Sequence, residues 1–309
     1  MGKHSHQQGH SHTHAHAHAH AHAHQHTASN RIGWAFFLNV TFTIIEFIGG
    51  WLTNSTAIMA DAVHDLGDSL AIGTAWGLNK LGEKDANQVF TYGFKRFSLL
   101  GALVNSLVLI VGSIWIMFEA IPRLSNPEMP HTEGMFALAI FGILVNGYAA
   151  YKLSDGGTLN ERVLNWHLIE DVLGWVAVLI VSVVLMFKPW PILDPILSIA
   201  FTLFILINVL KNLKMTLVLF LQATPDNTTR EAVKRILLSP SSVDDVHHLH
   251  IWSLDGEQHV MTAHLVLNEQ IGVPIMKEIK ADLHAQLAQF NLAHTTIEFE
   301  FSDETCRDS

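Results

Sequence analysis

The sequence predicts an α-helical membrane protein with six transmembrane helices and a small α+β domain at its C-terminal end. Three observations support this. Of its 309 residues, 49% are hydrophobic and only 15% are charged, with a mean hydropathy of +0.28. Six apolar stretches each have about the length that a helix needs to cross ~30 Å of hydrocarbon. After Gln222 the sequence becomes polar and loses this pattern. An average soluble domain is less apolar and more highly charged.

The first segment, residues 1–29, is a histidine-rich tail. It holds eleven of the 21 histidines, and the later ones alternate with alanine. Such a low-complexity segment has little to bury, so we expect it to be disordered. Neutral imidazoles at this density bind Zn²⁺, Ni²⁺ or Cu²⁺ weakly and in many arrangements. We interpret the segment as a metal-collecting tail that the central chemistry does not need; the alternative is an expression tag.

Residues 30–222 are predicted to form the transmembrane domain. The expected spans are Ile32–Leu52, Ser55–Leu81, Phe97–Ile121, Glu133–Leu153, Asn165–Phe187 and Ile192–Leu221. Most of the lysines and arginines near the ends of these spans fall on one side of the membrane, where Lys80, Lys84, Lys95, Arg96, Lys152, Arg162, Lys211 and Lys214 lie. The positive-inside rule therefore places both termini in the cytoplasm.

Two spans carry the same pair of metal-binding residue types at the same spacing. His64 and Asp68 lie in the second span, and His167 and Asp171 lie in the fifth. Residues four apart in a helix share a face, so each pair can reach one ion. Ionisable groups at membrane depth are costly unless they are paired, bind metal or line an ion path. The two pairs predict one site with four ligands; the alternative is histidines that cap helix ends or bond within a polar bundle core.

Other polar residues in the spans have less specific explanations. Asn39, Asn105 and Asn146 are interpreted as hydrogen-bonding contacts between helices. Glu46 is compatible with a proton path or with pairing to a cation, and its spacing does not choose between them. Asp194, at the start of the sixth span, is interpreted as a helix-start residue.

Residues 223–309 are predicted to form a separate small domain. The pattern indicates two strands joined by the turn Asp255–Gly256, with one helix before them and a second helix and a third strand after them. In chain order these elements are Thr228–Leu238, Val243–Leu254, Gln258–Leu267, Pro274–Gln289 and Thr295–Phe301. This αββαβ order favours an antiparallel sheet with helices on one face.

The domain is also rich in histidine. The candidates are His247, His248, His250, His259, His264, His284 and His294, together with Glu298 and Glu300. Strand alternation predicts that His248 and His250 share one face and that His247 lies on the other. Two interpretations remain open: a metal site at a sheet edge or subunit boundary, or histidines of the surface and core.

Composition excludes several other functions. The formal charge is −10 and the sequence has no basic stripe, so we expect no nucleic-acid partner. Cys306 is the only cysteine, which excludes a disulfide within the chain and any multi-thiolate metal site. A membrane-embedded zinc hydrolase would need an open zinc site with a general base, such as HExxH, and that motif is absent. We therefore expect no enzymatic activity.

Taken together, these motifs resemble the cation diffusion facilitator family over nearly the whole chain after the tail. The matching segments are Ser55–Asp68, Tyr92–Asn105, His167–Asp171, Leu193–Pro195 and His247–Leu254. The resemblance implies a homodimeric six-helix exporter of divalent metal, driven by proton antiport, with a ferredoxin-like cytoplasmic domain. It implies that His64, Asp68, His167 and Asp171 are the transport ligands, with His64 similar to the zinc-transporting branch. It also implies a cytoplasmic zinc site with His247, His264, Glu300 and His294.

The predicted function is export of Zn²⁺, with Cd²⁺ next, from the cytoplasm in exchange for protons. Two imidazoles and two carboxylates suit tetrahedral Zn²⁺ and make the occupied site formally neutral. Without the ion, two carboxylates in an apolar bundle would be costly, so protons should replace the metal. The expected location is a bacterial inner (plasma) membrane, in contact with lipid. The rival hypothesis is a metal-storage or metal-sensing membrane protein, and the cytoplasmic domain is either a zinc sensor or only a dimerisation module.

Overall fold

The computed structural model describes residues 36–82, 84, 86–153, 159–268, 271–306 and 308. The histidine-rich tail lies outside them. Six long helices form the first part of the described chain: Phe36–Thr53, α2 (Thr56–Gly82), α3 (Phe97–Ser125), α4 (Thr132–Leu153), α5 (Leu159–Phe187) and α6 (Leu193–Phe220). The predicted six-helix architecture is confirmed.

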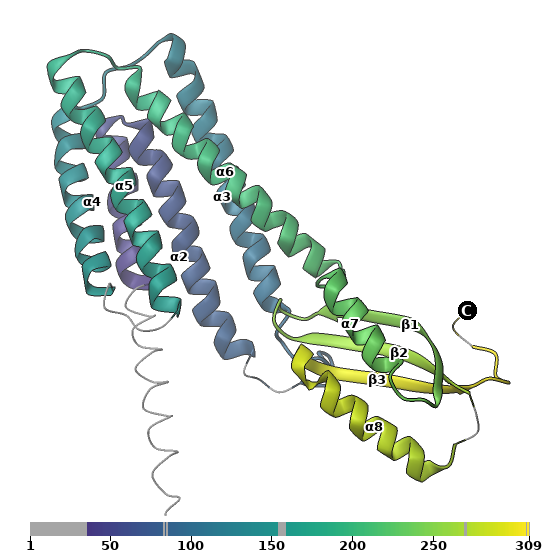
Figure 1. Cartoon of the computed structure of the whole chain (residues 1–309). Coiled ribbons are helices and arrows are strands. Elements are labelled where there is room, and N and C mark those ends of the chain that lie inside the picture. The colour runs from purple at the N-terminus through teal and green to yellow at the C-terminus, as the bar shows by residue number, and fades with distance from the viewer. Residues whose placement is uncertain are drawn as a thin grey trace, which may run out of the picture.

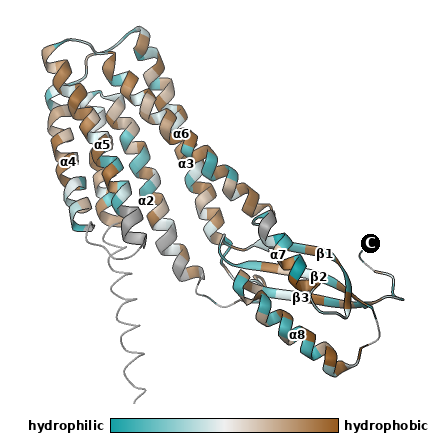
Figure 2. Ribbon diagram, viewed as in Figure 1, coloured by the Kyte–Doolittle hydropathy of each residue, from teal (hydrophilic) through white to brown (hydrophobic). Residues whose placement is uncertain are grey.

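Helix α2 differs from the other five in composition. The other five are long and apolar enough to cross a membrane. Over its first eighteen residues α2 carries Asp61, Asp65 and Asp68, and these carboxylates reduce its hydropathy. Figure 2 shows hydrophobic residues along the other helices and hydrophilic residues on α2. The helix that departs from membrane composition is therefore the one that supplies half of the predicted metal site.

The helices pack in two groups that meet at α2. Helix α4 packs mainly on α5, and α3 mainly on α6, while α2 contacts α3 and α6 (Figure 1). One buried apolar cluster joins the first helix, α2, α4 and α5 around Trp175, and another joins α2, α3 and α6 around Ile116. Since α2 contributes to both clusters, its position relates the two groups of helices to each other.

Helices α3 and α6 lead to the C-terminal domain. Helices α3 and α6 have 29 and 28 residues, or about 42 Å, more than the ~30 Å of a hydrocarbon core. At their lower ends in Figure 1, the Arg96 guanidinium donates a hydrogen bond of 2.8 Å to the carbonyl oxygen of Phe220. The Lys95 ammonium donates to the side chain of Gln258. The C-terminal domain is therefore attached where α3 begins and α6 ends.

That domain contains α7 (Asn227–Leu237), β1 (Val243–Ser253), β2 (His259–Leu267), α8 (Val273–Leu287), a short 3₁₀ turn (Ala288–Phe290) and β3 (Leu292–Phe301). The sheet order is β1-β2-β3. Strands β1 and β2 are antiparallel, but β2 and β3 are parallel. The prediction of an antiparallel sheet was wrong for β3, because α8 carries the chain back to the end at which β2 began.

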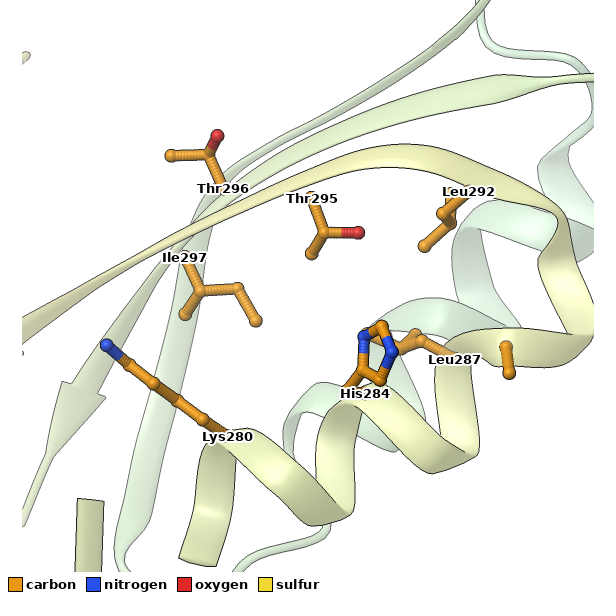
Figure 3. Close-up of a pocket in the computed structure, with 8 residues that line it drawn as sticks. Lys280, His284, Leu287, Leu292, Thr295, Thr296 and Ile297 are labelled. Carbon is orange, nitrogen blue, oxygen red and sulfur yellow. The ribbon is translucent and has the colours of Figure 1, made fainter. Parts of the chain in front are cut away.

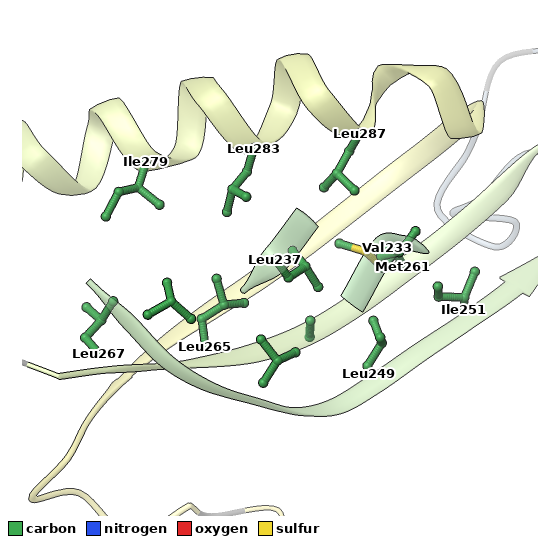
Figure 4. Packing of buried hydrophobic residues seen from close by; sticks show 13 residues of the cluster. Val233, Leu237, Leu249, Ile251, Met261, Leu265, Leu267, Ile279, Leu283 and Leu287 are labelled. Carbon is green, nitrogen blue, oxygen red and sulfur yellow. The ribbon is translucent and has the colours of Figure 1, made fainter. Parts of the chain in front are cut away.

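The core of this domain lies between the sheet and its two helices. It includes Val233 and Leu237 of α7, Leu283 of α8, and Met261 and Leu265 of β2, all fully buried (Figure 4). The Asp226 carboxylate caps α7 by accepting a hydrogen bond of 2.6 Å from the Thr229 amide. Both helices contribute to this one cluster, which leaves the opposite face of the sheet to its histidines.

Candidate metal-binding sites

The two predicted half-sites meet between α2 and α5. The His167 Nε2 atom lies 2.9 Å from Asp68 Oδ2 and 3.8 Å from Asp171 Oδ2. The His64 Nε2 atom lies 3.6 Å from Asp68 Oδ2 and 3.9 Å from Asp171 Oδ1. Each imidazole is thus within 4 Å of a carboxylate on its own helix and of one on the other helix. The structure brings together all four residues that the sequence pairs suggested.

The dimensions of this cluster suit a tetrahedral zinc ion. With zinc–ligand distances of about 2.0–2.2 Å, neighbouring ligand atoms lie roughly 3.4 Å apart. The four distances above, from 2.9 to 3.9 Å, bracket that value. Two neutral imidazoles and two carboxylates would give a formally neutral site with a divalent cation. Ligand atoms of His64, His167 and Asp171 also lie within 4.8 Å of one another.

Burial differs among the four ligands. The side chains of His64, Asp68 and His167 are 28%, 24% and 28% exposed, but that of Asp171 is only 9% exposed. The Oδ1 atom of Asp171 is buried without a hydrogen-bond partner among the described residues. A buried carboxylate oxygen without a partner is costly. The Oδ2 atom of Asp68 is likewise buried without such a partner, so a cation would offset a cost at both carboxylates.

More carboxylates lie beside the site than it uses. Asp61 and Asp65 of α2 are 7% and 4% exposed. Glu46 of the first helix is fully buried and lies close to both. Asp65 can also approach an ion held by His64 and Asp68. The sequence left the role of Glu46 open, and the structure places it in this acidic group on the first-helix side of α2.

A second cluster lies in the C-terminal domain and combines three strands with the chain end. The His264 Nδ1 atom is 2.6 Å from Glu300 Oε1, and His247 Nε2 is 2.9 Å from Glu300 Oε2. The Cys306 sulfur lies 3.6 Å from His264 Nδ1. Ligand atoms of these four residues all lie within 4.8 Å of one another. Imidazole, carboxylate and thiolate are the donors that zinc takes in proteins, so the set fits that ion.

The electrostatics of Glu300 agree with this arrangement. Burial acts to raise the pKa of its carboxyl, but hydrogen bonds with Cys306 and His264 outweigh burial and hold the pKa below its usual value. The carboxylate is thus ionised at neutral pH, the form that binds metal.

A β-bulge changes which histidines share a face. The pairing of β1 with β2 shifts between His247 and His250, and His248 has a left-handed backbone with a φ of 47°. The rings of His247 and His248 lie 5.1 Å apart, and each lies within 5.5 Å of the His264 ring. The prediction that His247 and His248 lie on opposite faces was wrong, because the bulge interrupts the alternation.

His294 and His284 lie away from this cluster. His294 is the β3 partner of Val260, whereas Glu300 is the partner of Val266, so the two are near opposite ends of β3. The His294 ring instead contacts Tyr92, at a centroid distance of 5.0 Å. His284 lines a groove between α8 and β3 with Lys280 and Ile297, on the helical side of the sheet (Figure 3). The grouping of His294 with His247, His264 and Glu300 is not found in the structure.

Comparison with known proteins agrees with both parts of the fold. Residues 34–221 match the family model described as the cation efflux transmembrane domain, and residues 225–301 match that of the cation efflux protein cytoplasmic domain. The chain belongs to the cation diffusion facilitator family. It is a multi-pass membrane protein.

Several members of the cation diffusion facilitator family are similar along most of their length. A cadmium, cobalt and zinc/H⁺-K⁺ antiporter of Bacillus subtilis is 33% identical, over 86% of this chain and 87% of the relative. The metal cation efflux system protein CzcD of Cupriavidus metallidurans is 32% identical, over 86% and 84%. The zinc transporter ZitB of Escherichia coli is 31% identical, over 88% of each chain.

Sequence reasoning missed Cys306 as a member of the second cluster. It noted only that one cysteine excludes a multi-thiolate site, which does not exclude a single thiolate among other ligands. Cys306 follows β3 by five residues, and the position of a chain end on a sheet is not encoded in a local pattern. The presence of a soft ligand shortly after Glu300 was the one available signal.

Proposed function

We propose that this protein exports Zn²⁺ from the cytoplasm in exchange for protons, with Cd²⁺ as a second substrate. The observation that carries the proposal is the meeting of His64, Asp68, His167 and Asp171 around a point that suits one tetrahedral ion. The names of the zinc and cadmium transporters among its relatives support the same substrates.

The two carboxylates provide the coupling to protons. When zinc is bound, its two positive charges offset Asp68 and Asp171. When zinc leaves, two unbalanced carboxylates in an apolar bundle would be unfavourable, so protons take its place. Metal and protons thus compete for the same oxygens, and each cycle exchanges one for the other without a separate proton site.

Imidazole and carboxylate ligands also explain the choice of ion. Mg²⁺ and Ca²⁺ prefer shells made only of oxygen, so two imidazoles disfavour them. Zn²⁺ fits a small tetrahedral site of nitrogen and oxygen best, and Cd²⁺ is a larger ion with related preferences. The proposal therefore places zinc first and cadmium second.

The decisive test is zinc-driven proton flux in proteoliposomes containing wild type or Asp171→Asn. The variant keeps the size of the side chain but removes the charge, so we expect flux to fall to background. Glu170→Gln is the matched control, because Glu170 is the exposed neighbour of Asp171 and should not be needed. Equal flux in wild type and Asp171→Asn would refute the transport site. Zinc binding without flux in wild type would instead favour the storage or sensing alternative.

We further propose that the cytoplasmic cluster is a regulatory zinc site in a homodimer. His247, His264, Glu300 and Cys306 would hold the ion, and zinc there would stabilise one arrangement of the paired domains. With this domain in the cytoplasm, both termini are cytoplasmic and the helices cross a bacterial inner membrane. Sedimentation of the full chain in detergent, with and without zinc, tests the dimer and its response to metal.

A further inference from the structure

Asp194, at the start of α6, binds the first turn of a different helix. Its Oδ2 atom accepts hydrogen bonds of 2.7 and 2.9 Å from the amide and hydroxyl of Thr56. Its Oδ1 atom accepts one of 2.5 Å from the hydroxyl of Ser55. Asp194 is only 1% exposed. A carboxylate of α6 is thus buried against the N-terminal end of α2.

The position of this carboxylate has a clear physical basis. The first amides of a helix lack partners within the helix, and a carboxylate near them is favoured by hydrogen bonding and by the helix dipole. Such a cap normally comes from the residue just before the helix. Here Ser55 already accepts from the Ile58 amide in that role, at 3.3 Å. The N-terminal end of α2 thus already has a local cap, and Asp194 adds a connection from this end to α6.

A second bond strengthens this connection. One turn further along α6, the Ser198 hydroxyl donates a hydrogen bond of 3.0 Å to the carbonyl oxygen of Thr56. Ser198 is fully buried. Together, Asp194 and Ser198 hold both the amide and the carbonyl group of Thr56, which fixes the first turn of α2 along the axis of α6.

This connection bears on the metal site because of how α2 is held. Helix α2 carries His64 and Asp68 about 12 and 18 Å beyond Thr56. The other two proposed ligands are on α5, which packs mainly on α4, whereas α2 has far more contact with α3 and α6 than with α5. The distance between the half-sites therefore depends on how α2 is positioned by its neighbours. A shift of α2 along α6 would move His64 and Asp68 past His167 and Asp171.

We propose that Asp194 is a positioning residue for the transport site: by tying the first turn of α2 to α6, it sets the register of His64 and Asp68 against α5. The proposal rests on the transport function given above. It differs from simple stabilisation of α2, because it requires the carboxylate to belong to α6 and not merely to cap α2.

Moving the carboxylate from α6 to α2 distinguishes stabilisation of α2 from positioning of α2 against α6. In Asp194→Ala the bonds to Ser55 and Thr56 are lost. In the double variant Ser55→Asp with Asp194→Ala, the carboxylate is attached to α2 itself, at its cap position and next to the vacated space. Aspartate is among the best N-cap residues, so the double variant returns a carboxylate to this end of α2. It leaves α2 without its tie to the Asp194 position of α6.

The measurement is the zinc dependence of proton flux in proteoliposomes, with the thermal midpoint of the purified protein as a measure of folding. We expect Asp194→Ala to lower the midpoint and to raise the KM for zinc by about 10- to 100-fold, as loss of a group that orients metal ligands does. The double variant should regain the midpoint but keep the high KM. Thr202→Val is the matched control: Thr202 lies two turns along α6, is 2% exposed, and its hydroxyl has no partner among the described residues. Its KM should equal that of wild type.

A KM like that of wild type in Asp194→Ala, or in the double variant, would overturn the proposal. If Asp194→Ala does not fold, Asp194→Asn decides, because its amide group cannot accept two of the bonds; an unchanged KM there would also overturn it. Failure of the transport function would look different. In that case Asp171→Asn would keep its flux, whatever the Asp194 variants do.

Discussion

Close packing of α4 on α5 at one glycine predicts a measurable effect on the α5 half-site. A Cβ atom on Gly142 of α4 would lie 2.3, 2.4 and 2.6 Å from three ring atoms of Trp175, distances that require the indole to move. Trp175 is 1% exposed and packs edge-on against Phe42, with ring centroids 6.0 Å apart. It follows Asp171 by one helical turn. Gly142→Ala should therefore displace α5 at the turn that carries the proposed metal ligand Asp171.

The size of the effect follows from two opposing terms. Overpacking a filled core costs about 1–3 kcal/mol. Replacing glycine by alanine within a helix contributes about 1 kcal/mol of stability. Gly147→Ala is the matched control on α4, because its Cβ would meet only Val172, at 4.0 Å. Gly147→Ala gains only the higher helix propensity of alanine, whereas Gly142→Ala gains the same amount and also overpacks Trp175. The two variants should therefore differ in unfolding free energy by the overpacking cost, about 1–3 kcal/mol.

The assays are the thermal midpoint of each purified variant and its KM for zinc in proteoliposomes. Gly142→Ala should have a lower midpoint than Gly147→Ala and a higher KM than wild type, while Gly147→Ala keeps the KM of wild type. Equal midpoints would show that Trp175 can move at no cost. A lower midpoint with an unchanged KM would refute the link from Trp175 to Asp171.

Three further predictions concern the metal ligands and the tail. His64→Asp should broaden selectivity toward larger or harder ions, because it replaces an imidazole by an oxygen ligand; an unchanged ratio of zinc to cadmium transport would contradict the role of His64. Zinc should protect Cys306, the only thiol, from alkylation by a maleimide in the full chain, and equal labelling with and without zinc would remove it from the cytoplasmic site. Deletion of Met1–Ser29 should leave metal resistance in cells intact, whereas loss of resistance would favour the storage hypothesis.

The meeting of His64, Asp68, His167 and Asp171 could be predicted because their pattern is local and repeated. The spacing of His64 and Asp68 places both on one face of a helix, and a second pair with the same spacing in another span suggests a shared ion. The lengths of the apolar spans also predicted the transmembrane helices. Helix α2 is less apolar than the others because it carries the aspartates near the proposed metal site. These features depend on helix geometry, which is the same in every context.

The features that sequence could not supply all depend on which segments meet. The bulge at His248 arises from the pairing of β1 with β2, and the parallel β3 arises from the path of α8. Asp194 was interpreted as a helix-start residue and does lie in the first turn of α6, but its carboxylate bonds to the start of α2, 138 positions earlier. Cys306 reaches its cluster from the chain end. None of these contacts leaves a periodic signal.

The two metal clusters differ in a way that suits their proposed roles. The proposed cytoplasmic ligands His247, His264 and Glu300 come from adjacent strands of one sheet, whose backbone hydrogen bonds hold these strands together. The proposed transport ligands come from α2 and α5, which have little direct contact with each other. A site shared by two separately packed helices can change its dimensions when those helices move, and a transported ion must be released as well as bound. A site on one sheet holds its dimensions, as a sensor of cytoplasmic zinc requires.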